Sequence, residues 1–188
     1  MRIASIAMNI GNVYYLNMFL GTGAIILQIF SVIALFLLFL RPKENAYLSF
    51  IDKHYLNLSF VIALIASLFS LVYSEIIGFV PCYLCWYQRT FMFPLPFIFG
   101  TAIWYKDRKI VKYVLPLLCV GAIFSVYQNF FYYFGESSNL PCDASGVSCY
   151  QQLINVFGGY ISFPMLSLSG YVALITIALV AHFYKKED

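Results

Sequence analysis

The chain has 188 residues, of which 62% are hydrophobic and only 10% are charged, and its mean hydropathy is +0.83. A soluble domain carries about 25% charged residues, so a water-soluble globular protein is excluded. The net charge of +3 does not indicate a nucleic acid partner, because basic residues in the cytoplasmic loops of a membrane protein account for it.

The first apolar segment runs from about residue 16 to residue 40, and no charged residue lies between Ile3 and Leu40. A helix needs roughly 20 residues to cross a hydrocarbon core of about 30 Å. The segment is too long for the core of a signal peptide, which has about 7 to 15 apolar residues, and no A-x-A-like cleavage site precedes Arg41. We therefore expect a membrane-spanning helix that stays on the mature protein.

Four further apolar segments follow, separated by polar connections, the first of which is a loop predicted for residues 41–54. The predicted spans cover about residues 55–73, 81–105, 113–134 and 165–184. The sequence therefore predicts an all-α integral membrane protein with five spans. A four-helix transmembrane bundle would occupy residues 55–188, and one extra N-terminal transmembrane helix with a cytoplasmic loop would occupy residues 1–54.

Lys and Arg residues are distributed unequally between the two sides of the predicted bundle. Three lie in the 41–54 loop, four in the 106–112 loop and two in the carboxyl-terminal tail, whereas the other side has only Arg2 and Arg89. Because cytoplasmic loops carry the excess of Lys and Arg, we expect the amino terminus outside and the carboxyl terminus in the cytoplasm. The connections at residues 74–85 and 135–164 then lie on the outer face, where an oxidising environment lets disulfides form and persist. They contain two pairs of cysteines, Cys82 with Cys85 and Cys142 with Cys149.

Cys82 and Cys85 are separated by two residues and directly follow Pro81, at the start of the third predicted span. Proline suits the first turn of a helix, because its missing N–H costs nothing there. The partial positive charge at a helix N-terminus favours the thiolate, which is the form that attacks disulfides. The same spacing supplies half of many zinc sites and occurs in structural disulfides, so the motif indicates redox chemistry without settling it.

Arg89 lies four residues beyond Cys85 and therefore on the same face of the predicted helix. An arginine at mid-depth in a membrane costs about 2.5 to 3.5 kcal/mol on insertion scales, so its presence needs a reason. It would either anchor the helix to lipid phosphate, or stabilise the Cys85 thiolate and the developing anion on an electron acceptor dissolved in the membrane. The residues alone leave both interpretations open.

Cys142 and Cys149 enclose a short segment that is flexible enough to bring both sulfurs within bonding distance. An isolated pair of this kind slightly favours a structural disulfide. Two pairs on one face favour a relay instead, because thiolate attack through a mixed disulfide moves electrons from one pair to the other. A zinc ion bound by all four thiolates is disfavoured by the unequal spacings, the long separation of the pairs and the apolar setting.

Two residues of the fourth predicted span complete the candidates. Cys119 has no partner in the sequence and is interpreted as a small buried hydrophobe without a further role. Gln128 lies nearer the outer end of the span. Polar residues in membrane helices usually hold helices together, and a quinone-binding role for Gln128 is the functional alternative.

The segment Pro81–Arg89, PCYLCWYQR, followed by FMFPL, resembles the DsbB/BdbC family of bacterial disulfide-forming membrane proteins. The resemblance extends to LPC at 140–142, to Cys149 and to ISFPMLSL at 161–168, and it covers about residues 55–184. Relatives of vitamin K epoxide reductase share the chemistry, but in them the loop pair precedes the membrane C-x-x-C. Here the C-x-x-C comes first.

The resemblance implies a thiol oxidase of the bacterial inner membrane with its cysteines on the extracytoplasmic face. Such a protein oxidises a DsbA-like thioredoxin-fold partner and passes the electrons to ubiquinone or menaquinone, without a metal. By the same resemblance, Cys142 forms the mixed disulfide with the partner, Cys149 exchanges with Cys82, and Cys85 faces the quinone beside Arg89.

Three features depart from the family pattern. The first span is extra to the usual four, and packing, anchoring or partner docking are the roles open to it. Relatives often carry a histidine near the outer end of the equivalent of the fourth span, where Gln128 is expected to stand as a quinone contact. The segment between Cys142 and Cys149 is short, as in the BdbC-like branch.

Two other classes of membrane protein compete with a thiol oxidase. A small transporter would show ionisable residues in mid-membrane or broken helices at a midplane site, and the sequence has no clear pair of such features. A structural membrane subunit stapled by two disulfides would tolerate the loss of either cysteine pair without losing a catalytic activity.

Overall fold

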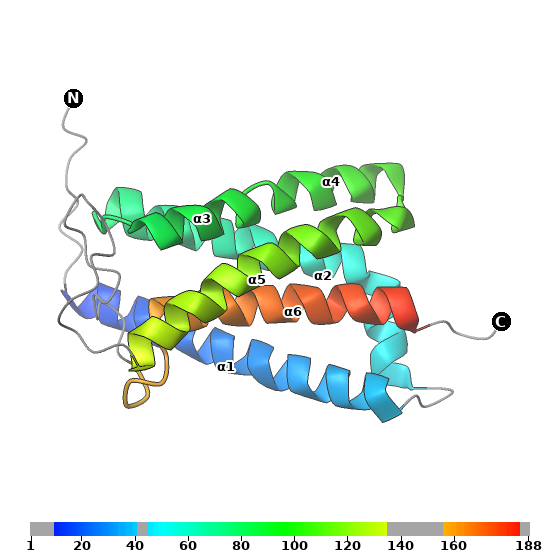
Figure 1. The fold of residues 1–188 in the computed structure, drawn as a ribbon, viewed down its shortest axis with the longest axis horizontal. Coiled ribbons are helices and arrows are strands. Elements are labelled where there is room, and N and C mark those ends of the chain that lie inside the picture. The colour runs from blue at the N-terminus through cyan, green and yellow to red at the C-terminus, as the bar shows by residue number, and fades with distance from the viewer. Residues whose placement is uncertain (1–9, 41–44, 135–155, 185–188) are drawn as a thin grey trace.

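The computed structural model describes residues 10–40, 45–134 and 156–184, and these ranges are almost entirely helical. The helices are α1 (Ile10–Leu40), α2 (Ala46–Leu71), α3 (Tyr83–Met92), α4 (Leu95–Tyr105), α5 (Val111–Phe134) and α6 (Phe163–Phe183). A π-helical turn, Val72–Ile76, continues α2, and a 3-10 turn, Arg108–Ile110, precedes α5. All the helices run roughly along the long axis of one bundle (Figure 1).

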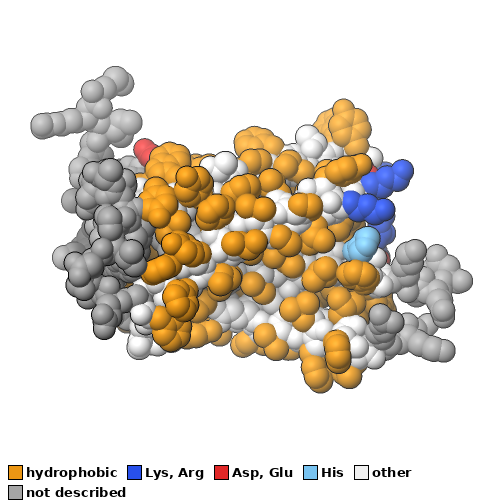
Figure 2. Space-filling view, in the orientation of Figure 1, with side chains coloured by type: hydrophobic (Ala, Val, Ile, Leu, Met, Phe, Trp, Pro, Cys, Tyr) orange, Lys and Arg blue, Asp and Glu red, His pale blue; other side chains and the backbone are white. Residues whose placement is uncertain are grey.

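The outer surface of the bundle is apolar along most of its length. Among the described residues, four helices are long and apolar enough to cross a membrane, at Val13–Leu40, Ala46–Ile76, Arg108–Phe134 and Phe163–Phe183. Hydrophobic side chains cover the middle of the molecule, and Lys and Arg side chains gather at one end (Figure 2). A helix at the surface of a soluble protein would turn a polar face outward, so the predicted all-α integral membrane architecture is confirmed.

The third predicted span consists of two short helices instead of one, because Pro94 interrupts it. Proline has no N–H to donate, and its ring clashes with the carbonyl of the preceding turn. Helix α3 therefore closes with the N–H of Phe93 donating to the carbonyl of Arg89 at 2.9 Å, and α4 opens with the N–H of Ile98 donating to the carbonyl of Pro94 at 3.0 Å. The two helices follow each other along one edge of the bundle and together take the place of the predicted span (Figure 1).

The polar loop predicted for residues 41–54 was too long, because α2 already begins at Ala46. The side chain of Asn45 accepts hydrogen bonds from the N–H groups of Tyr47 and Leu48, at 2.9 and 3.3 Å, and so caps the helix. Asp52 and Lys53, two of the charged residues in the predicted loop, thus lie within a helix. The division of the chain after residue 54 stays a prediction.

Helix α6 lies at the centre of the bundle and packs against α1, α2 and α5. Its Tyr171 is completely buried and passes close to the backbone of α5 at Gly121. A Cβ atom at Gly121 would lie only 2.4 Å from the Tyr171 ring, so glycine is what allows α5 and α6 to approach here. Helix α3 packs mainly on α5, and α4 on α2.

Helix α1, the span that is extra to the family pattern, is joined to the bundle by polar contacts. Gln28 Nε2 donates to Ser169 Oγ at 2.8 Å, and the hydroxyl of Tyr160 donates to Gln28 Oε1 at 3.0 Å. Closer to its start, Asn17 Oδ1 accepts a hydrogen bond from the hydroxyl of Tyr73. Polar side chains of this kind hold membrane helices together, so α1 has the packing role that was one of its three options.

Candidate active site

Cys82 and Cys85 lie together at the start of α3. Cys82 is the N-cap residue, with extended backbone angles, and its carbonyl accepts the N–H of Trp86 at 3.1 Å. Both side chains are free thiols whose sulfur atoms are 3.1 Å apart, and Cys82 is only 2% exposed. The predicted pair is therefore assembled at a helix N-terminus, where the two sulfurs can pass between a dithiol and a disulfide.

A buried amide from α5 faces both sulfurs. Gln128 Nε2 donates to Cys82 Sγ and to Cys85 Sγ, each at 3.6 Å. Its Oε1 atom in turn accepts a hydrogen bond of 2.6 Å from Nε2 of Gln88. The structure thus brings the predicted residue Gln128 to the cysteine pair, 43 positions further along the chain than Cys85.

Gln88 is a member of this cluster that sequence reasoning missed. It lies on α3 three residues after Cys85, so the i, i+3 spacing was the signal that could have found it. Its side chain is buried. Its backbone carbonyl accepts a hydrogen bond of 2.7 Å from the hydroxyl of Tyr171. Helices α3, α5 and α6 therefore meet at one polar cluster, composed of Cys82, Cys85, Gln88, Gln128 and Tyr171.

Arg89 is buried in the bundle at 8% exposure, next to this cluster along α3, and its guanidinium reaches α2. Its Nε atom donates to Ser70 Oγ at 2.9 Å, and one of its terminal nitrogens donates to the Ser70 carbonyl at 2.7 Å. The guanidinium carbon also lies 5.5 Å from the centre of the Trp86 ring and 5.8 Å from that of Phe93. Lipid phosphate is therefore not needed to explain the position of this side chain.

The surroundings of Arg89 suit a flat acceptor with carbonyl oxygens. Within the described ranges its charge has no ion-pair partner, so the cation remains available to an anion or a polarised oxygen. Two aromatic rings lie beside it, and Trp86 is largely exposed on the outer surface of the bundle. A cationic donor next to aromatic surface could hold a flat acceptor with carbonyl oxygens, such as the quinone that the resemblance implies.

Cys142 and Cys149 lie outside the described residues, so their approach to Cys82 stays a prediction. The chain is described again from residue 156, in a turn whose ends, Val156 and Ile161, pair through their backbones. The hydroxyl of Tyr133 donates to the Tyr160 carbonyl at 2.6 Å and fixes this turn at the end of α5. The segment after the second pair thus returns to the end of the bundle at which α3 begins (Figure 1).

Cys119 does not occupy the buried position expected for it. It is exposed on α5, next to the completely buried Leu118. Successive residues of a helix point about 100° apart, so the face of α5 that packs on α6 includes Leu118 and turns Cys119 outward. Its sulfur belongs to the surface that the membrane covers and takes no part in the cysteine cluster.

Comparison with known proteins identifies the family. The family model for the disulfide bond formation protein DsbB matches residues 52–183. The chain belongs to the DsbB family. This membership gives it a role in disulfide bond formation, and it confirms the family that the motifs around Cys82 and Cys149 indicated.

Several members of the family that resemble this DsbB-family chain come from Bacillus. It is 38% identical to a probable disulfide formation protein C 2 of Bacillus anthracis over 141 residues, which are 75% of this chain and 99% of the relative. It is 45% identical to the disulfide bond formation protein C of Bacillus subtilis over 122 residues, which are 64% of this chain and 87% of the relative. No solved structure matches the chain.

Proposed function

We propose that this chain is a membrane thiol oxidase that reoxidises a DsbA-like thioredoxin-fold partner and passes the electrons to ubiquinone or menaquinone. It would thereby support disulfide formation in exported proteins. The observation that carries the proposal is the contact of the Cys82 and Cys85 sulfurs at the start of α3, 3.1 Å apart and next to a buried amide donor. A disulfide with only a structural role needs no donor that favours its reduced form.

The first transfers are thiol–disulfide exchanges. A thiolate of the reduced partner attacks Cys142 of the Cys142–Cys149 disulfide and releases Cys149 as a thiolate. The partner's second thiolate then attacks the partner sulfur of the mixed disulfide and releases Cys142 as a thiolate, so that the partner leaves oxidised. The Cys149 thiolate then attacks Cys82 and releases Cys85 as a thiolate. Attack of Cys142 on Cys149 restores the first disulfide and leaves Cys82 and Cys85 reduced.

Reoxidation of Cys82 and Cys85 needs an acceptor of two electrons and two protons. A membrane quinone, when bound, would serve as this acceptor. Arg89 is the residue proposed to bind and orient its carbonyl oxygen, and Ser70 holds the guanidinium in place from α2 through two hydrogen bonds. The rings of Trp86 and Phe93 would contact the flat face of the quinone. Gln128 remains the second predicted quinone contact, although its amide donates to the two sulfurs in this structure.

The charge distribution supports a position of the cysteines on the periplasmic or extracytoplasmic face of the bacterial inner membrane. Lys and Arg side chains gather at the end of the bundle remote from α3 (Figure 2). Cytoplasmic loops carry such an excess, so the cysteine pairs would face the compartment in which exported proteins acquire disulfides.

The test is quinone reduction by the purified protein in detergent, supplied with a reduced DsbA-like partner. Cys85→Ser and Cys142→Ser should both abolish partner-dependent turnover, because each breaks one pair of the relay. Cys119→Ser is the matched control and should turn over like the wild type, since Cys119 lies on the outer surface of α5. A wild-type protein that retains both disulfides but reduces no quinone with any reduced partner would identify a structural membrane subunit instead.

A further inference from the structure

Gln88 and Gln128 form a directed chain of hydrogen bonds that ends on the cysteine pair. Gln88 Nε2 donates to Gln128 Oε1 at 2.6 Å, and Gln128 Nε2 donates to each sulfur at 3.6 Å. Both amides are buried, with 7% and 3% of their surfaces exposed. Buried polar groups of this kind need partners, and the partners that each one finds decide which way its amide points.

We propose that Gln88 is a positioning residue that holds the Gln128 amide with its N–H groups toward Cys82 and Cys85, so that Gln128 stabilises the thiolate formed whenever this pair is opened. The inference rests on the proposed redox role of the pair. It assigns Gln88 a function that acts only through Gln128, and it assigns Gln128 a function toward sulfur in addition to any contact with a quinone.

The direction of the chain follows from the chemistry of the sulfurs. A thiolate accepts hydrogen bonds and has none to donate, so it is stabilised only when the nitrogen of the Gln128 amide faces it. That orientation turns Oε1 toward α3, where a donor is required. Gln88 supplies this donor from the same helix that carries both cysteines, and the hydroxyl of Tyr171 holds its backbone carbonyl.

The step at which the donor acts is the opening of the Cys82–Cys85 disulfide. The Cys149 thiolate forms a bond to Cys82 Sγ, the bond between Cys82 Sγ and Cys85 Sγ breaks, and its electron pair leaves on Cys85 Sγ. The Gln128 N–H groups already face this sulfur, so no reorganisation is needed when the charge appears. In the water-poor interior such a hydrogen bond is stronger than it would be at the surface.

Stabilisation of the thiolate should change the reduction potential of the Cys82–Cys85 pair in a defined direction. A donor that favours the thiolate favours the reduced pair and therefore raises its reduction potential. Removing the Gln128 amide should lower the reduction potential. Removing the Gln88 amide, which orients Gln128, should also lower it, but by less. A residue with only a packing role would change the stability of the bundle without moving the potential.

The experiment measures the reduction potential of Cys82 and Cys85 in the purified full-length chain, with Cys119, Cys142 and Cys149 replaced by alanine so that one pair remains. The protein in detergent is equilibrated in dithiothreitol or glutathione redox buffers, and free thiols are trapped with a maleimide mass tag. The rate of alkylation of the reduced pair is recorded against pH. Gln128→Met should shift the equilibrium about tenfold toward the disulfide, or about 30 mV, and Gln88→Met about fivefold, or about 20 mV.

A double-mutant cycle tests whether Gln88 acts through Gln128. In a Gln128→Met background, Gln88→Met should have no further effect on the potential or on the alkylation profile. Ser125→Ala is the matched control, because Ser125 lies on α5 one turn before Gln128 and pairs with Ser167 instead of α3. It should lower thermal stability at most and leave the potential at the wild-type value.

If Gln88→Met fails to fold, Gln88→Glu keeps the length of the side chain and its hydrogen bond. An ionised carboxylate only accepts, so Gln128 would turn its N–H groups away from the sulfurs, and the potential should again fall. The proposal is overturned if the foldable Gln88 variant keeps the wild-type potential and alkylation profile, or if its effect persists without Gln128. A wild-type protein that reduces no quinone would overturn the thiol oxidase function instead. The shifts in reduction potential of the Gln88 and Gln128 variants would be unaffected by that result.

Discussion

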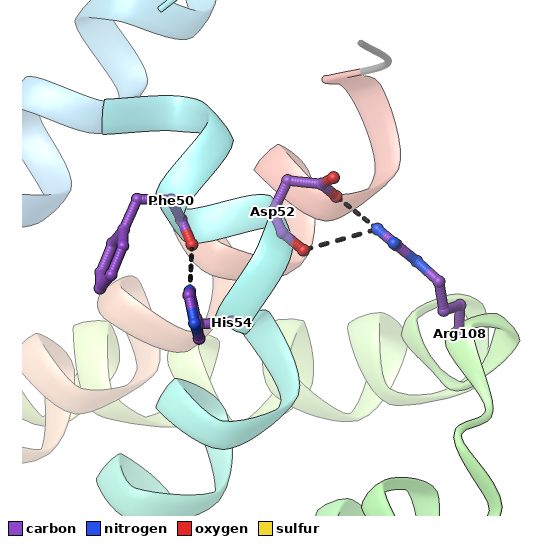
Figure 3. A network of polar contacts seen from close by, with 4 residues as sticks. All are labelled: Phe50, Asp52, His54 and Arg108. Atoms are coloured by element: carbon purple, nitrogen blue, oxygen red, sulfur yellow. Dashed lines mark hydrogen bonds and ion pairs between the residues drawn. The ribbon is translucent and has the colours of Figure 1, made fainter. Parts of the chain in front are cut away.

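Arg89 and Arg108 lie near opposite ends of the bundle, and their surroundings differ in almost every respect. Arg89 is buried at 8% exposure and donates to a serine side chain and a carbonyl. The Arg108 side chain is 62% exposed and forms an ion pair of 2.6 Å with Asp52 (Figure 3). Its guanidinium also lies over the ring of Tyr55. Arg108 thus has a counter-ion and contact with solvent, whereas Arg89 is buried and has no counter-ion among the described residues.

The difference shows which arginine stability alone can explain. An exposed ion pair contributes about 0 to 1 kcal/mol, and Arg108 with Asp52 ties the start of α5 to α2 at that level. A buried cation without a counter-ion loses solvation and recovers only part of it through neutral acceptors. Arg89 is therefore expected to cost stability where it lies, which agrees with the role proposed for it at the electron acceptor.

The largest effect is expected from Arg89→Met, which keeps an unbranched apolar stem and removes the guanidinium and its charge. Hydrogen bonds to charged groups contribute about 1.5 to 3 kcal/mol, so quinone reduction should fall by about 10-fold to 100-fold. Thermal stability in detergent should stay unchanged or rise, because a desolvated charge is removed. Arg108→Met is the control for a lost arginine and should leave the rate of quinone reduction unchanged. Unchanged turnover with reduced stability in Arg89→Met would make Arg89 a structural anchor.

A smaller effect is expected from Ser70→Ala. The substitution removes the hydroxyl that accepts from Arg89 Nε but leaves the Ser70 carbonyl as the second acceptor. One hydrogen bond contributes about 1 kcal/mol, so quinone reduction should fall about fivefold. Ser67→Ala, one turn earlier on α2, removes a buried hydroxyl that has no hydrogen-bond partner among the described residues and serves as the matched control. Equal rates for both variants would show that Ser70 does not orient the guanidinium.

The features of the site that sequence could predict are local ones. The C-x-x-C spacing after Pro81 placed Cys82 and Cys85 at the start of a helix, and the charge of Arg89 within an apolar span marked it as unusual. Both depend on residues that are neighbours along the chain. The family motifs added roles for these residues, and the roles of Cys142 and Cys149 stay predictions.

The features that sequence did not predict depend on contacts between helices. The acceptors of Arg89 lie on α2 and the donor to both sulfurs lies on α5, and nothing in the local pattern of α3 specifies either neighbour. Cys119 was misplaced for the same reason, because the inward face of α5 is known only once α6 is packed against it. The interruption at Pro94 was the exception, since a proline inside a predicted span is a visible local signal.

A third prediction concerns the polar contacts that hold α1 inside the apolar region, between the two ends. Gln28→Leu removes the bonds to Ser169 and Tyr160 and should lower the free energy of unfolding by about 1 kcal/mol, since such bonds in membrane proteins average about 0.6 kcal/mol each. Thr22→Val is the matched control on α1, because the Thr22 hydroxyl donates within its own helix, to the carbonyl of Met18. Thermal unfolding in detergent measures both. A loss no larger than that of the control would mean that apolar packing alone holds α1.

The smallest effect is expected at the exposed ion pair. Asp52→Asn should lower the free energy of unfolding by less than about 1 kcal/mol, and the loss should fade at high salt, because exposed charges are screened. Arg108→Met should cost more than Asp52→Asn, since it also removes the contact with the Tyr55 ring. A double-mutant cycle in detergent at low and high salt isolates the coupling of the two charges. A coupling energy well above about 1 kcal/mol that does not fall at high salt would mean that the Arg108–Asp52 ion pair is shielded from water. Arg89 and Arg108 would then differ in their partners and not in their solvation.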